Sequence, residues 1–189
     1  MKKLFTLLAI VLSLQGCVFA AGAAAGAAAI AVVYDHRKIE KIILDQRIAS
    51  AIKERIEANE ELSTKAHINV TCFNQTVLLT GEAITKEMRE EAEVIARGTP
   101  DVQHVYNALT LQAPSSSLTR TSDAWITTKI KTKMLADKEL ESSTIKVVTE
   151  NGTVYLLGIV SRDQADIAVE IARQESGVQK VVRIFQYTN

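Results

Sequence analysis

The chain has 189 residues, of which 47% are hydrophobic and 23% charged, a composition typical of a folded protein rather than a disordered one. Basic and acidic side chains balance at 22 each. The chain therefore lacks the overall positive charge that would indicate a nucleic-acid partner. This length fits one or two compact domains.

The first 16 residues have the features of an export signal. A short basic start precedes an apolar run from Leu4 to Leu14, which is too short to span a membrane comfortably. "LQGC", residues 14–17, resembles the lipobox of bacterial lipoproteins, in which the chain is cleaved before the cysteine and the cysteine is acylated. We therefore predict a lipoprotein signal peptide at 1–16 and lipidation of Cys17. The alternative is a plain secretory signal with a chance cysteine.

Residues 17–36 are rich in alanine and glycine and are predicted to form a lipidated tether. The tether either lies along the membrane surface or forms a short helix in which Gly22 and Gly26 make a pairing face. Once Cys17 is acylated, Cys72 is the only other cysteine, so no internal disulfide is expected. Cys72 shares one face of an alternating strand pattern with Ile68 and Val70, so it is predicted to be buried rather than a reactive thiol.

The rest of the chain repeats itself. "RIASAIKERIEANEEL" at 47–62 aligns with "WITTKIKTKMLADKEL" at 125–140, and "INVTCFNQTVLLTG" at 68–81 aligns with "IKVVTENGTVYLLG" at 145–158. "EVIARGTPDVQHVYNAL" at 93–109 aligns with "VEIARQESGVQKVVRIF" at 169–185. We predict two homologous domains, 37–111 and 122–189, joined by a linker at 112–121, with Ser122 and Asp123 as candidate N-caps.

Each copy predicts the same order of elements: a helix, two alternating strands joined by a turn, a second helix and a short final strand. Asn151-Gly152 predicts a two-residue hairpin turn, because both residues tolerate positive φ, whereas Asn74-Gln75 predicts its turn less strongly. Gly81 and Gly158 are expected to close the second strand of each copy. The fold class is therefore α+β.

These repeated runs resemble the BON domain, an αββαβ module of bacterial envelope proteins, over nearly all of residues 45–187. Together with the lipobox, they make the chain similar to dual-BON outer-membrane lipoproteins. The resemblance implies a three-stranded mixed sheet packed against two helices in each domain. It also implies a non-enzymatic, lipid-anchored protein that faces the periplasm, supports outer-membrane integrity and collects at the division site.

The partners that the resemblance implies are anionic phospholipids, namely phosphatidylglycerol and cardiolipin, and the machinery that assembles outer-membrane β-barrels. It places the lipid surface on the first helix of the second domain. The matching positions are Trp125, Lys131, Lys133 and Leu135, with Gly158 nearby.

The internal repeat supports this placement independently. Ile126, Ile130 and Met134 stack as one apolar stripe of the helix expected at 123–135, and the first copy keeps isoleucine at these positions. On the opposite side, Trp125 replaces Arg47 and Leu135 replaces Glu57. We predict a lipid-binding face made by Trp125, Lys129, Lys131, Lys133, Leu135 and Gly158.

Two alternatives for this face remain open. It docks a protein partner, such as a β-barrel assembly component or a peptidoglycan-associated protein, or it packs against the first domain or the linker. No catalytic motif is present, so no enzyme activity and no cofactor are expected. His36, His67 and His104 are scattered and have no cysteine or acid at metal-ligand spacing, so no metal site is expected.

Overall fold

The computed structural model describes residues 39–188, which belong to one compact unit. The predicted signal peptide, Cys17 and the Ala/Gly-rich tether lie outside the described residues. Within the described residues, no helix is both long enough and apolar enough to cross a membrane.

The first copy contains α2 (Ile39–Ala58), α3 (Glu60–Lys65), β1 (His67–Phe73), β2 (Thr76–Ala83), α4 (Lys86–Arg97), β3 (His104–Asn107) and β4 (Thr110–Leu111). β1 pairs antiparallel with β2, while β3 and β4 both pair parallel with β2. β3 and β4 together take the place of the single final strand that the sequence predicted.

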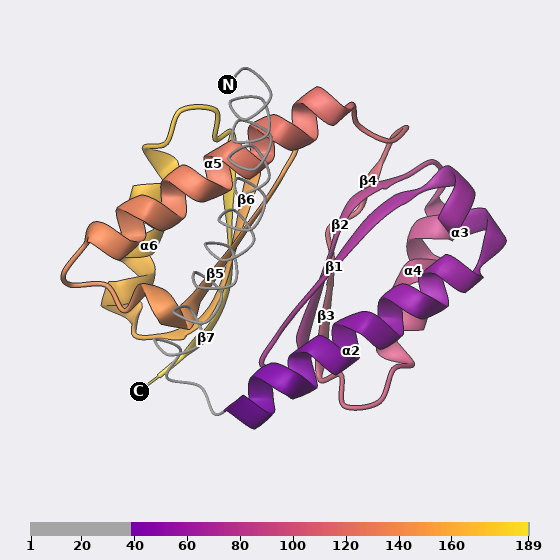
Figure 1. Cartoon of the computed structure of the whole chain (residues 1–189), viewed down its shortest axis with the longest axis horizontal. Helices are drawn as coiled ribbons and strands as arrows, with labels where there is room; N and C mark the ends of the chain where they lie inside the picture. Colours follow the sequence, from indigo (N-terminus) through magenta and orange to yellow (C-terminus); the bar gives the residue numbers. More distant parts are fainter. Residues whose placement is uncertain (1–38, 189) are drawn as a thin grey trace, which may run out of the picture. The chain divides into compact units, whose positions relative to one another are not determined.

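The second copy contains α5 (Ser117–Ala136), a 3₁₀ turn η1 (Ser142–Thr144), β5 (Ile145–Glu150), β6 (Thr153–Val160), α6 (Arg162–Arg173) and β7 (Lys180–Tyr187). β6 is the central strand, antiparallel to β5 and parallel to β7. In each copy the two long helices cover one face of a mixed sheet (Figure 1). The predicted α+β class and αββαβ order are confirmed.

The helix that carries the predicted lipid-binding face begins earlier than expected. Ser116 is its N-cap, and the Ser116 hydroxyl accepts a hydrogen bond from the Thr119 amide. Residues 117–121, which the sequence analysis assigned to the linker, are therefore helical. The prediction of Ser122 and Asp123 as N-caps is wrong, because both lie inside the helix.

Asp123 instead holds the hairpin turn of its own domain. Its buried carboxylate accepts hydrogen bonds from the amides of Asn151 and Gly152 at 2.8 and 2.9 Å. Both turn residues have positive φ, which confirms the predicted two-residue turn. A buried carboxylate at this position thus joins the first helix to the sheet.

The first copy has the same carboxylate-to-turn hydrogen bonds, with different turn residues. Asp45 accepts hydrogen bonds from the amides of Asn74 and Gln75 at 2.7 and 2.8 Å. Asn74 and Gln75 have φ of 47° and 61°, so the turn forms without a glycine. The aspartate compensates for a turn sequence that is weak by itself.

The second strands do not end at their glycines. β2 continues two residues past Gly81, and β6 continues two residues past Gly158. A Cβ at Gly81 would lie 2.0 Å from the carbonyl oxygen of His67, and one at Gly158 would lie 2.8 Å from that of Thr144. These glycines allow close approach of the neighbouring backbone instead of closing the strand.

Three apolar clusters make up the core of the described residues. One lies between α2, α4 and the first sheet, and a second lies between α5, α6 and the second sheet. The third joins the helix-free faces of the two sheets and contains Phe73, Leu78, Tyr155, Leu157 and Ile184. β2 is buried along its whole length because it contributes to two of these clusters.

Candidate functional site

The face of α5 opposite the core exposes three large apolar side chains. Leu118, Trp125 and Leu135 are 81%, 63% and 77% exposed. Their spacing places them on one side of the helix together with three threonines. We call this surface the outer face of α5; it consists of Leu118, Thr121, Trp125, Thr128, Thr132 and Leu135.

Leu118 was missed by the sequence analysis, which placed it in the linker. The run of three serines between Pro114 and Leu118 was the signal that could have found it, because serine just before the first apolar residue of a periodic segment is a common N-cap. Leu118 and Leu135 are 17 positions apart, so the face extends over about 26 Å at 1.5 Å per residue. The opposite stripe, with Ile126, Ile130 and Met134, is buried as predicted.

The hydroxyl groups of the threonines on the outer face donate hydrogen bonds to backbone carbonyls of α5 itself. Thr121 donates to the Ser117 carbonyl, Thr128 to the Ala124 carbonyl and Thr132 to the Thr128 carbonyl, each at 2.9 Å. Removing these hydroxyls from water leaves no donor unpaired. The face can therefore be desolvated at low cost.

Two of the three predicted lysines are engaged by a buried acid. Lys129 Nζ lies 2.5 Å from Oε1 of Glu175, and Lys133 Nζ lies 2.7 Å from Oε2. The hydrogen bond from Lys129, followed by the contact with Lys133, lowers the pKa of Glu175 to about 2. Lys129 is largely covered, Lys133 is about half exposed, and Lys131 is exposed on the other flank of the outer face.

The equivalent face of the first copy is charged. Arg47 and Glu57 stand where Trp125 and Leu135 stand in the second copy, and both are exposed. Glu57 also forms an ion pair with Lys53 at 3.6 Å. The equivalent face of α2 keeps one exposed apolar residue, Ile43, at the position of Thr121. Because the two copies share their fold and core stripe, packing does not explain why the face is mainly apolar in α5 and mainly charged in α2.

Two other predicted residues are placed away from the surface. Gly158 is buried in β6, paired with Ile145 and Phe185, and presents no surface of its own. The structure thus gives Gly158 a packing position, and its part in lipid binding stays a prediction. Cys72 is buried as predicted; burial, and then the charge of Asp45, raise the pKa of its thiol to about 12.

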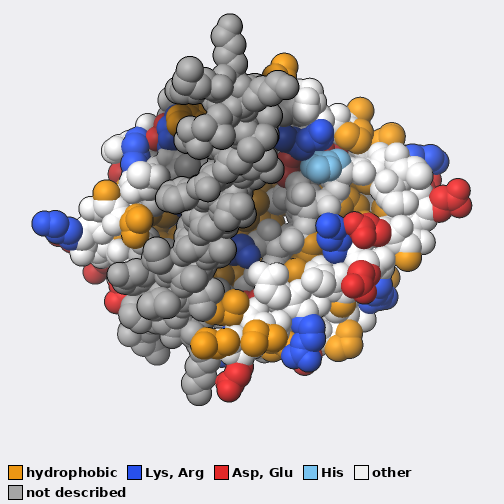
Figure 2. All heavy atoms as spheres, in the orientation of Figure 1, with side chains coloured by type: hydrophobic (Ala, Val, Ile, Leu, Met, Phe, Trp, Pro, Cys, Tyr) orange, Lys and Arg blue, Asp and Glu red, His pale blue; other side chains and the backbone are white. Residues whose placement is uncertain are grey.

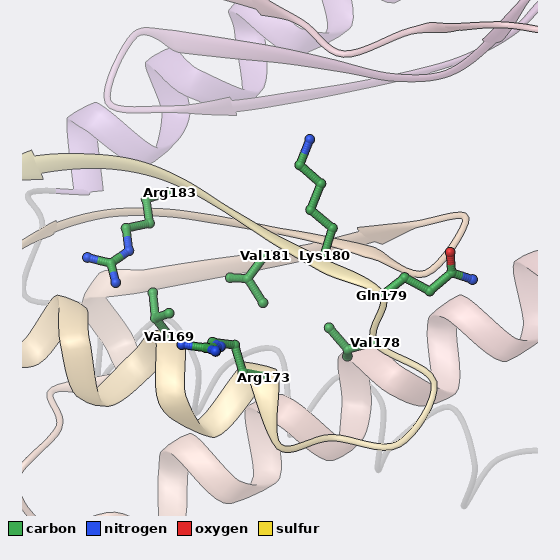
Figure 3. A pocket seen from close by; sticks show the side chains of 7 residues that line it. All are labelled: Val169, Arg173, Val178, Gln179, Lys180, Val181 and Arg183. Carbon is green, nitrogen blue, oxygen red and sulfur yellow. The ribbon is translucent and has the colours of Figure 1, made fainter.

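A pocket of about 360 Å³ lies between α6 and β7 and offers a weaker candidate site. It is lined by Val169, Arg173, Val178, Gln179, Lys180, Val181 and Arg183 (Figure 3). Lys180 points to the opposite side of β7 from Val169 and Arg173 in that view. Arg183 pairs with Asp166 at 2.9 Å, so the positive charge around the pocket is partly neutralised.

The rest of the surface carries both positive and negative side chains. On the face in Figure 2, basic and acidic side chains are interspersed over the described residues. The α5 helix differs, since it carries four basic residues and one acidic residue, and the acidic one, Asp123, is buried. The outer face of α5 is therefore the strongest candidate site.

Comparison with known proteins identifies the class. The BON domain family model matches residues 44–113 and 122–189, so the chain belongs to the BON-domain family, with two copies of the domain. It is 36% identical over 187 residues to outer membrane lipoprotein DolP of Haemophilus influenzae, covering 99% of this chain and 96% of the relative. The chain is thus a DolP-like dual-BON lipoprotein of the outer membrane.

Other relatives are similar over shorter stretches. A protein named 21 kDa hemolysin from Actinobacillus pleuropneumoniae is 37% identical over 150 residues, covering 79% of this chain and 75% of that protein. Among solved structures, the C-terminal domain of CdsD from the type III secretion system of Chlamydia trachomatis matches 77% of this chain and 67% of its own. Its identity is 12% and its TM-score 0.31.

Proposed function

We propose that this chain is a non-enzymatic lipoprotein that binds anionic phospholipids through the outer face of α5 and supports outer-membrane integrity at the division site. The observation that carries the proposal is the exposure of Leu118, Trp125 and Leu135 on one face of a basic helix. Acylated Cys17 attaches the chain to the membrane, which raises the effective concentration of this face near lipid.

The chemistry of the outer face suits the boundary between headgroups and acyl chains. An indole places its ring in the apolar layer and keeps its N–H hydrated, and the leucines and threonine methyl groups add apolar contact. The internally bonded threonine hydroxyls support this reading, because they do not require water.

The lysines take different roles in the proposal. Lys131 and the half-exposed Lys133 reach toward lipid phosphates, each contributing on the order of 1 kcal/mol near an anionic surface. Lys129 holds Glu175 and so orients the flank of the helix. Gly158 acts indirectly, by allowing the sheet beneath α5 to pack closely.

Vesicle flotation tests the proposal. The chain from residue 17, with Cys17→Ser to remove the lipid, is mixed with vesicles that contain or lack phosphatidylglycerol or cardiolipin. We expect flotation only with anionic vesicles, weakened by added salt because exposed charges are screened. Trp125→Glu and Leu135→Glu should abolish it, since each removes apolar contact and adds a charge that the membrane repels.

Arg47→Glu is the matched control, because residue 47 occupies the position of Trp125 in the first copy. It should float like the unaltered chain, and circular dichroism should show all three variants folded. Equal flotation of the Trp125 and Leu135 variants, or none by the unaltered chain, would contradict lipid binding. The outer face would then be assigned to a protein partner, such as the β-barrel assembly machinery, and crosslinking from residue 125 would identify it.

A further inference from the structure

Three potential metal ligands from distant parts of the sequence meet in the described residues. They are His67 on β1, Glu82 on β2 and Glu150 on β5, and their ligand atoms all lie within 4.8 Å of one another. Glu82 is fully buried, Glu150 is 8% exposed and His67 is half-buried. The first copy supplies two of these groups and the second copy supplies one.

Asparagine side chains hold both carboxylates and leave oxygens available. Asn151 Nδ2 donates to Oε1 of Glu82 at 2.6 Å, and Asn69 Nδ2 donates to Oε2 of Glu150 at 2.9 Å. The same Asn69 nitrogen lies 3.2 Å from Nε2 of His67. Hydrogen bonds that orient ligating carboxylates in this way are typical of metal sites. The Asn69 amide has to turn away from Nε2 of His67 before the lone pair of that nitrogen can bind an ion.

A buried oxygen without a partner points to a ligand here. Oε2 of Glu82 has no hydrogen-bond partner among the described residues, and neither has Oγ1 of Thr80, which lies two residues earlier on the same face of β2. Leaving a buried carboxylate oxygen unpaired is costly, so native proteins usually satisfy it with water or an ion.

The two carboxylates of the cluster also lack a basic partner other than His67 in the described part of the chain. Within residues 39–188, no lysine or arginine forms an ion pair with Glu82 or Glu150. Two buried carboxylates close together repel each other unless a proton or a cation lies between them. A divalent cation would balance both charges at once.

We propose that His67, Glu82 and Glu150 bind a transition-metal dication, with Zn²⁺ as the representative ion. An imidazole nitrogen with two carboxylates favours such an ion over Ca²⁺ or Mg²⁺, which take oxygen ligands. Tetrahedral ligands about 2.0–2.2 Å from Zn²⁺ lie about 3.3–3.6 Å apart. Ligand atoms within 4.8 Å of one another therefore have to close by at most about 1.5 Å. The bound ion would crosslink the two BON domains.

Metal retention by the purified protein tests the site. The mature lipidated chain, in detergent and without a histidine tag, is stripped with a chelator, loaded with ZnCl₂, desalted and analysed by mass spectrometry for metal. We expect about one Zn²⁺ per chain and a higher thermal unfolding midpoint than in the stripped protein. His67→Gln and Glu150→Gln should each lose the ion and this thermal shift.

His104→Gln is the matched control, since His104 is an exposed histidine on β3 outside the cluster, and it should retain the ion. Loading with Co²⁺ gives a second readout that does not depend on variants. We expect a visible absorption spectrum typical of Co²⁺ bound by nitrogen and oxygen ligands, without a thiolate charge-transfer band from Cys72. No retained Zn²⁺ in the unaltered chain, equal loss in His104→Gln, or a thiolate band would each overturn the proposal.

Discussion

Glu175 shows how a single buried side chain sets the charge available near the outer face of α5. It engages Lys129 and Lys133, so only part of the positive charge counted along the helix is available to a partner. The sequence analysis predicted that all three lysines of α5 contact lipid. The spacing of lysines within a helix does not reveal that Glu175, in the loop after α6, binds two of them. Lys131 is the lysine that this acid leaves untouched.

Glu175→Gln tests this ion pair through its pH dependence. The pKa of Glu175 in the folded state is about 2, below its ordinary 4.5, so its ionised form stabilises the fold. This contribution is complete well above pH 4.5 and is lost as the pH falls from 4.5 toward 2. We expect the thermal midpoint of the unaltered chain to exceed that of the variant at pH 7, and the difference to shrink toward pH 2.

The same variant bears on the proposed function. Replacing Glu175 with glutamine removes one negative charge beside the outer face and releases Lys129 and Lys133. We expect binding to anionic vesicles to tighten by roughly fivefold, the effect of about 1 kcal/mol for one unit of charge. Unchanged binding in a titration of vesicles at low salt would argue against an electrostatic role for this flank.

At the scale of elements, the first helix of each copy is tied to its hairpin by one buried aspartate. Asp45 and Asp123 occupy equivalent positions and each accepts two backbone hydrogen bonds from its turn. The sequence analysis assigned Asp123 to a helix cap, because an aspartate that bonds to a distant turn has the same local pattern as one that caps a helix. Only the fold brings the turn to it.

Asp123→Ala should lower the free energy of unfolding by about 3 kcal/mol, because two buried amides lose a charged acceptor. Chemical denaturation followed by circular dichroism would measure the loss. Asp163→Ala, at an exposed position in the first turn of α6, is a suitable control and should change stability little. A similar small change in Asp123→Ala would show that water replaces the carboxylate at the turn.

At the scale of the whole described unit, the helix-free faces of the two sheets bury a common apolar cluster. Leu78 of the first copy and Leu157 of the second both belong to it and are almost completely buried. Stability should therefore be shared between the copies, even though each has its own core between helices and sheet.

Leu157→Ala tests this sharing. A buried leucine replaced by alanine typically costs about 2–5 kcal/mol, and we expect one cooperative unfolding transition that shifts as a whole. Differential scanning calorimetry would follow it, with Leu118→Ala on the exposed outer face of α5 as a control that leaves the midpoint nearly unchanged. A split into two transitions, with only one shifted, would show that the copies unfold independently.

The sequence by itself determined the repeated αββαβ order, the core stripe Ile126, Ile130 and Met134, and the exposure of Trp125 and Leu135. These features follow from periodicity along one chain segment and from comparison of two copies with the same core. The Asn151-Gly152 turn belongs with them, because its conformation depends on the local preference for positive φ.

Tertiary structure decided what distant segments bring together. It paired Glu175 with Lys129 and packed Gly158 against the backbone of Thr144. It also placed His67 and Glu82 beside Glu150, although histidines and acids show no metal-ligand spacing in the sequence. Such contacts depend on strand register and on how sheet faces meet. These relations are not encoded in the spacing of neighbouring residues, so no local pattern predicts them.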